Sequence, residues 1–191
     1  MFITRVDSSL ERLLRARLPL PTEVGDVSFD PPTATWSATL SRITVNLFLY
    51  DVQHSSMPPT AAQRGGQGHP GMRRRPLPMM QLGYLVSAWA GSPRDEHQLL
   101  GDVVSILTGL DQVPAEFTAP ELQSPVRFAI KEDPRNAPRD IWSATGGQLK
   151  ASVALQAVVA ADTFDWAEEP PAVEHIQVLS APRVPATGQV R

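Results

Sequence analysis

The side chains that could carry catalysis are few in this chain, and their spacing does not bring them together. The four histidines are His54, His69, His97 and His175, and no two of them stand four residues apart on one helix face. A zinc site needs three or four convergent ligands, and the chain has no cysteine to supply thiolates. No Gly-x-Ser-x-Gly segment marks a serine nucleophile. The sequence therefore predicts no metal, no cofactor and no enzymatic activity.

Two further patterns contain residue types found at phosphate-binding or catalytic sites but lack the other features that such sites need. Residues 65–68 read Gly-Gly-Gln-Gly, yet a phosphate-binding loop also needs a Gly-Lys-Ser/Thr that contacts phosphate and magnesium. Glu132 and Asp133 are adjacent acids, as are Glu168 and Glu169. Paired carboxylates perform acid–base chemistry when burial and a facing partner separate their pKa values, whereas adjacent acids near prolines are usually solvated. Both patterns are typical of surface loops.

A cluster of arginines is the strongest chemical feature. The segment 55–76 is rich in Pro, Gly and Gln, contains Arg64, Arg73, Arg74 and Arg75, and has no acidic residue. Loops of this length are usually functional or disordered. This one lacks the interleaved aromatic residues on which nucleic-acid bases stack. We therefore expect it to meet an acidic protein surface rather than RNA.

The C-terminal segment has the opposite character. Residues 161–191 begin acidic and proline-rich, and Trp166 stands there without any periodic context. An isolated tryptophan of this kind either anchors a segment onto a neighbouring subunit or packs on its own domain. The candidate interface residues are Arg64, Arg73, Arg74, Arg75, Asp165, Trp166, Glu168 and Glu169.

Composition sets limits on the class of protein. The chain has 191 residues, enough for one domain with a real core, and no apolar run long enough to span a bilayer. We expect a soluble protein made in the cytoplasm. Residues 1–80 carry nine Lys/Arg against six Asp/Glu, and residues 81–191 carry eight against fourteen. This asymmetry suits head-to-tail packing of identical subunits and argues against nucleic acid as the main partner.

The hydrophobic period predicts the elements that position these side chains. Asp7 is placed to cap a first helix over 8–17. Strict alternation over 42–52 predicts a strand that is covered everywhere on its aliphatic face and over half of its other face. A second long strand over 79–90 pairs with it as a hairpin whose tip is the basic loop. Ser92 then caps a helix that ends near Gly109.

The remaining elements complete one domain. Further strands are expected at 23–29, 126–131 and 149–160, and a short helix at 138–145. Trp89 and Trp142 are expected in the core, while Trp36 gives no clear signal. The fold class is α/β (α+β), with two principal helices on a mostly antiparallel or mixed sheet of five strands. Residues 1–160 form this domain with the long basic hairpin loop 55–76; residues 161–191 form an extended tail, disordered over 182–191.

Several of these segments together resemble the tail-terminator, or cap, family of phage-tail-like contractile injection systems. The resemblance covers about residues 3–160 in the same order and is carried by four segments. They are Ser28–Pro32, Val45–Val52, Arg73–Gly109, and Ile141–Ala144 followed by Gly146 and Gly147.

The resemblance implies a structural role. Such proteins form a six-fold ring that closes the end of the sheath and inner tube distal to the baseplate and stops their polymerisation. It therefore implies a homohexamer with sheath and inner tube proteins as partners, within a phage-tail-like particle, and no catalytic residues. The alternative from the residues alone is a small ligand- or RNA-binding regulatory module that uses the basic loop. Salt-sensitive retention of nucleic acid would distinguish the two.

Overall fold

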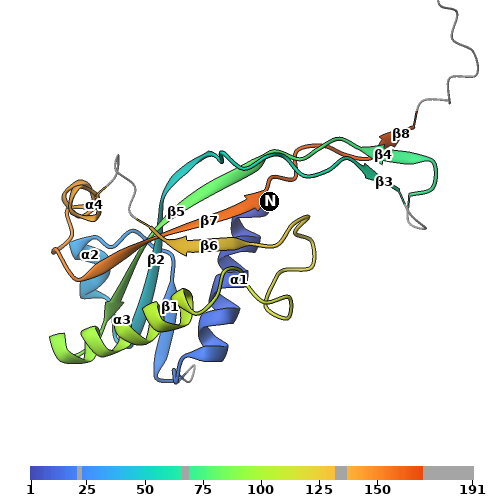
Figure 1. The fold of residues 1–191 in the computed structure, drawn as a ribbon. Coiled ribbons are helices and arrows are strands. Elements are labelled where there is room, and N and C mark those ends of the chain that lie inside the picture. The colour runs from blue at the N-terminus through green and yellow to red at the C-terminus, as the bar shows by residue number, and fades with distance from the viewer. Residues whose placement is uncertain (21–22, 66–68, 132–136, 170–191) are drawn as a thin grey trace, which may run out of the picture.

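The body of the molecule is a mixed five-stranded sheet with helices on both faces (Figure 1). The structure is a computed structural model that describes residues 1–20, 23–65, 69–131 and 137–169. The strand order is β1-β2-β5-β7-β6; β1 runs parallel to β2 and every other neighbouring pair is antiparallel. These strands are β1 (Gly25–Ser28), β2 (Ile43–His54), β5 (Met79–Trp89), β6 (Arg127–Ile130) and β7 (Ser152–Ala160). The predicted α+β fold class is confirmed.

Two long helices cover one face of the sheet and two short ones cover part of the other. The helices α1 (Phe2–Arg17) and α3 (Pro93–Thr108) pack on the main core, which includes the fully buried Val45 and Leu47 of β2. On the opposite face, α2 (Ala34–Ala38) and α4 (Pro138–Thr145) surround a second cluster built on Trp89 and Trp142. The alternation in β2 therefore buries its aliphatic side in one core and its aromatic side in the other, as its period predicts.

Local signals set the ends of two helices as predicted. Ser92 caps α3, because its Oγ accepts a hydrogen bond from the Asp95 backbone N–H at 3.3 Å. Pro93 fills the first helical position, where a missing N–H costs nothing. Gly146 ends α4 at a φ of 65°, a left-handed conformation in which glycine avoids the strain of a side chain.

The predicted start of the first helix was wrong. The helix α1 begins at Phe2, so Asp7 lies inside it rather than at its cap. The extra turn forms because Phe2 and Ile3 pack against the main core, which outweighs a capping hydrogen bond. Asp7 makes a tertiary contact instead: its Oδ1 accepts a hydrogen bond from the Tyr84 hydroxyl at 2.7 Å.

An arm, residues 55–65 and 69–78 together with 161–169, projects from one end of the sheet (Figure 1). Its tip is a second small sheet in the order β3-β4-β8, formed by β3 (Gln63–Arg64), β4 (Met72–Arg74) and β8 (Ala167–Glu168). The basic loop thus carries strands of its own, and the start of the expected tail supplies the third. Most of the expected tail (170–191, including 182–191, expected to be disordered) lies outside the described residues.

Candidate interface

The three consecutive arginines of the arm point to different surroundings. Arg73 and Arg75 are exposed, while the Arg74 side chain is only 6% exposed, because successive residues of a strand face opposite sides. The Arg74 guanidinium donates to the Phe164 carbonyl oxygen and forms an ion pair with the Asp162 carboxylate. A buried cation is tolerated when it is paired and hydrogen-bonded in this way. Arg74 therefore fastens residues 162–164 along the arm.

Asp162 also links the arm to the body. Its Oδ2 lies 3.7 Å from the Arg5 Nη1 on α1, while its other oxygen pairs with Arg74. The Arg5 Nη1 additionally donates to the Glu121 backbone carbonyl at 3.3 Å. One carboxylate thus joins the base of the arm to the first helix.

The outer end of the arm is held by weaker contacts. The Arg64 Nε lies 3.0 Å from Glu169 Oε1, but the Arg64 side chain is 85% exposed, so the ion pair contributes little stability. The Glu169 N–H donates to the Gly71 carbonyl at 2.9 Å and extends the pairing of β8 with β4. The Trp166 ring stacks on His69 with centroids 4.7 Å apart. Trp166 therefore packs on its own chain in this structure.

The structure brings all eight candidate interface residues to the arm tip, here defined as β3, residues 72–75 and residues 162–169. Six of the eight keep exposed charges there: Arg64, Arg73, Arg75, Asp165, Glu168 and Glu169. All of these except Arg64 border a hollow of about 460 Å³ together with Phe164, whose side chain is 37% exposed. The Arg75 guanidinium lies over the Phe164 ring, 5.9 Å from its centroid. The pair of Asp162 and Arg5 could not be predicted from the sequence, because no local pattern marks an ion pair between residues so far apart in the chain.

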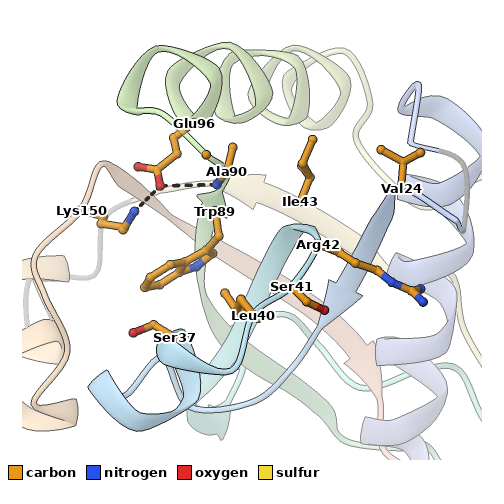
Figure 2. A pocket seen from close by; sticks show the side chains of 11 residues that line it. Val24, Ser37, Leu40, Ser41, Arg42, Ile43, Trp89, Ala90, Glu96 and Lys150 are labelled. Atoms are coloured by element: carbon orange, nitrogen blue, oxygen red, sulfur yellow. Dashed lines mark hydrogen bonds and ion pairs between the residues drawn. The ribbon is translucent and has the colours of Figure 1, made fainter.

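A second hollow lies at the other end of β5, where the strand finishes at Trp89. It measures about 430 Å³ and is lined by Leu40, Arg42, Ile43, Trp89 and Lys150, among other residues (Figure 2). The Lys150 ammonium pairs with the Glu96 carboxylate and lies 4.4 Å from the centroid of the Trp89 ring. Trp36, whose position could not be predicted from the sequence, packs its ring edge-on against the Trp89 ring, with the ring centroids 5.2 Å apart.

An adjoining hollow of about 430 Å³ continues this region past the Lys150–Glu96 pair. It shares Ala90, Gly91, Glu96 and Lys150 with the first hollow, and adds Leu149. We call the two hollows together the end surface.

Two titratable groups, Asp7 and Tyr84, contact each other inside the body. Burial raises the pKa of Asp7, and the hydrogen bond from Tyr84 opposes this. Burial raises the pKa of Tyr84, as does the nearby Asp7 carboxylate. Within the four described ranges, no group of three or more His, Asp or Glu side chains is placed to hold a metal ion. In the same ranges, no helix is both long and apolar enough to cross a membrane. His175 lies outside the described residues.

Solved structures with the same fold come from contractile injection systems. One is the sheath/tube terminator of the extracellular contractile injection system PVC in its extended state, with a TM-score of 0.62 and 21% identity. Another is the tube terminating cap of the anti-feeding prophage, with a TM-score of 0.64 and 20% identity. The alignments cover 94% and 95% of this chain. They cover only 64% and 62% of those proteins, so the chain spans less than two thirds of their length.

The family is settled by the sequence itself. No curated protein sequence matches the chain significantly. A sequence model of the Pvc16 N-terminal domain matches residues 5–175, which is nearly the whole chain. The tail-terminator resemblance found in the sequence is therefore confirmed, and the chain belongs to the Pvc16 N-terminal domain family.

Proposed function

We propose that this protein is a structural cap of a contractile injection particle. The observation that carries the proposal is the family match over residues 5–175. The shared fold supports it, because the two matched structures are a sheath/tube terminator and a tube terminating cap. On this proposal the chain is not an enzyme: it closes the distal end of sheath and inner tube and stops their polymerisation.

The proposed assembly is a homohexameric ring that contacts sheath and inner tube proteins. Head-to-tail subunits in a ring need two different, complementary surfaces on each copy. The arm tip and the end surface are candidates for two such surfaces, because each has a hollow bordered by charged side chains. The protein is made in the cytoplasm and joins the particle there, and nucleic acid is not among its partners.

Deleting the gene tests the proposal directly. Electron microscopy of particles from the deletion strain is expected to show sheath–tube assemblies of irregular length or with loose ends. Expression of the wild-type chain from a plasmid should restore uniform particles with a six-fold ring at one end. Uniform, closed particles in the deletion strain would contradict the proposed function.

The basic loop does not favour the RNA-binding alternative. Arg74 is buried against Asp162, and Arg64 pairs with Glu169, so two of the four arginines already face carboxylates of the same chain. Phosphate contacts depend on available cations. Salt-sensitive retention of RNA by the purified protein would nevertheless reopen this alternative.

A further inference from the structure

One long edge of the main sheet has no neighbouring strand. On one side, β5 pairs with β2 from Thr44 to His54. On the other side, β1 pairs with β2 only from Ile43 to Asn46. Within the described residues, no strand lies beside this outer side of β2 from Leu47 to His54, and we call that stretch the open edge. An unpaired edge of this length is a template for another strand, and proteins usually shorten or cover such edges.

At alternate residues of the open edge, the backbone groups point away from the sheet. The Ser55 N–H donates to the Met79 carbonyl at 2.9 Å and extends the ladder between β2 and β5 by one pair. Because hydrogen-bonded pairs alternate along an antiparallel ladder, Gln53 bonds to β5, whereas Val52 and His54 turn their N–H and C=O groups outward. Both residues are exposed, Val52 at 43%. In the described part of the chain, neither residue hydrogen-bonds to anything beyond the sheet. An incoming strand would therefore find free donors and acceptors beside an exposed apolar side chain.

The chain contains a segment that suits this edge. Residues 173–179, which lie outside the described residues, read Val-Glu-His-Ile-Gln-Val-Leu. The segment is rich in β-branched residues and has no glycine or proline, a composition that favours an extended strand. Pro170 and Pro171 precede it, directly after the arm tip. A proline cannot donate to a strand ladder, so the sequence predicts that the pairing of β8 with β4 stops before this segment.

The segment of the same molecule is badly placed to reach the open edge. The chain runs from β2 into β3 and from β7 into β8, and β3 and β8 form opposite edges of the small sheet (Figure 1). A returning tail would have to cross the arm tip and then follow the arm back to β2. Because β3 begins nine positions after β2 ends, that path is about 30 Å of extended chain. The tail would then present Pro182 and Pro185 to the open edge, where proline interrupts a ladder.

We propose that the open edge of β2 receives residues 173–179 of a neighbouring copy as an added strand. The added strand pairs with the outward backbone groups of Val52 and His54, and its apolar side chains cover Val52. Each copy gives one strand and accepts one at a different place, so the contact is head-to-tail, as in a closed ring. The inference rests on the proposed ring and specifies a contact that joins neighbouring subunits in it.

Hydrogen exchange at single amides tests the added strand in the assembled protein. The Val52 and His54 N–H groups face outward, whereas that of Gln53 between them bonds to β5 and serves as an internal reference. We expect Val52 and His54 to exchange at least about tenfold more slowly in the assembled wild type than in Ile176→Pro chains, with Gln53 equally protected in both. Val190→Pro, in the same tail but beyond the segment, should match the wild type. Equal exchange of Val52 and His54 in wild type and Ile176→Pro would overturn the proposal.

Cross-linking identifies the donor of the strand, because the chain has no cysteine of its own. Val52→Cys and Gln177→Cys chains with different tags are co-expressed in cells that make the particle and treated with a short bismaleimide. A chain that carries both substitutions is treated in parallel. We expect a product that joins the two tags, with at least about tenfold less when Val52→Cys is replaced by Ala129→Cys, an exposed position on the opposite edge strand β6.

Two other products would overturn the proposal. One is a cross-link that forms only within the doubly substituted chain, because the strand would then come from the same molecule. The other is a cross-link from Val52→Cys only to a different protein, because the open edge would then receive that protein.

The outcomes separate this inference from the proposed function. Uniform, capped particles that lack the cross-link between the two tags reject the added strand and leave the cap function standing. Uniform particles in the deletion strain reject the cap function itself.

Discussion

The body and the arm are two regions of one chain that are held together in different ways. In the body, apolar side chains from four helices pack on both faces of the sheet, and Leu155 at its centre is fully buried. In the arm tip, the strands are two or three residues long, and most side chains are exposed. Such short ladders are marginal in water on their own. The arm tip therefore depends on backbone pairing and a few side-chain contacts, while the body depends on apolar burial.

Because of this difference, we expect local opening to cost less free energy in the arm tip than in the body. Segments with little buried apolar surface open locally at a lower free energy than the core. Arg74 is the exception in the arm tip, because it is buried and binds both Asp162 and the Phe164 carbonyl. We therefore expect that the arm tip can be loosened while the body stays folded.

The largest expected effect is in the body, at Leu155. This side chain is fully buried in the main core. Leu155→Ala should lower the free energy of unfolding by about 2–5 kcal/mol, because it leaves a cavity. Urea denaturation measures the change. Leu149→Ala is the matched control: that side chain is 65% exposed, and we expect a change within about 0.5 kcal/mol.

The next effect should be confined to the arm. Arg74→Met removes the donor to the Phe164 carbonyl and leaves Asp162 with the longer pair to Arg5, which should weaken the local structure by about 1–3 kcal/mol. Hydrogen exchange should become faster at 72–74 and 167–168, with the melting temperature of the body unchanged. Arg73→Met removes an exposed arginine and should change neither the hydrogen exchange of the arm nor the melting temperature. An equal loss of protection from hydrogen exchange in α1 and β7 would show that arm and body unfold together. It would contradict the expectation that the arm opens independently of the body.

A smaller effect is expected at the cap of α3. Ser92→Ala removes the acceptor for the Asp95 N–H and should cost about 1 kcal/mol of stability. Ser92→Asp keeps an acceptor and should restore most of it. Exchange in the arm should be the same in both variants, because the cap lies at the other end of the sheet. Faster hydrogen exchange in the arm of Ser92→Ala would indicate that the stability of the arm is coupled to that of the body.

The smallest effect concerns pH and Asp7. Burial raises the pKa of Asp7 in the folded protein above its ordinary value of 3.8. Between the pKa of Asp7 in the unfolded protein and its raised pKa in the folded protein, the folded state holds more protons than the unfolded state. In this pH range the protein therefore loses stability as the pH rises and regains it on acidification. Asp7→Asn keeps an acceptor for Tyr84 and removes this dependence. Its stability advantage over the wild type, from urea denaturation at several pH values, should grow with pH and then level off. An advantage that grew on acidification would contradict the sign.

Much of the body could be predicted from residues close together in the chain. The strand expected at 42–52 is β2 (Ile43–His54), and the helix expected after Ser92 is α3 (Pro93–Thr108). Both carry strong periodic patterns with clear ends. The start of α1 was predicted wrongly, because packing of Phe2 and Ile3 extended the helix past the apparent cap. Trp36 gave no signal because its ring contact with Trp89 joins residues far apart in sequence.

The residue types of the candidate interface could be predicted from the sequence, but the contacts among them could not. The sequence identified a basic loop and an acidic segment, and it predicted that arginines would meet an acidic surface. The structure places residues 162–169 of the same chain on that loop, with Arg74 buried and Arg64 paired. Of the three consecutive arginines, Arg74 therefore has a structural role, whereas Arg73 and Arg75 are exposed.

By itself, the sequence determined most elements of the body, the cap of α3, the glycine end of α4 and the family, because apolar period, capping residues and motif order are all local properties. It predicted neither the true start of α1 nor the short helix α2. Only the tertiary structure decided that the acidic segment pairs with the basic loop as a third strand, that Asp7 binds Tyr84, and that Trp89 ends in a hollow opposite the arm. The physical reason is that long-range strand pairing and ion pairing are selected by the whole fold, since many local sequences are equally able to form them.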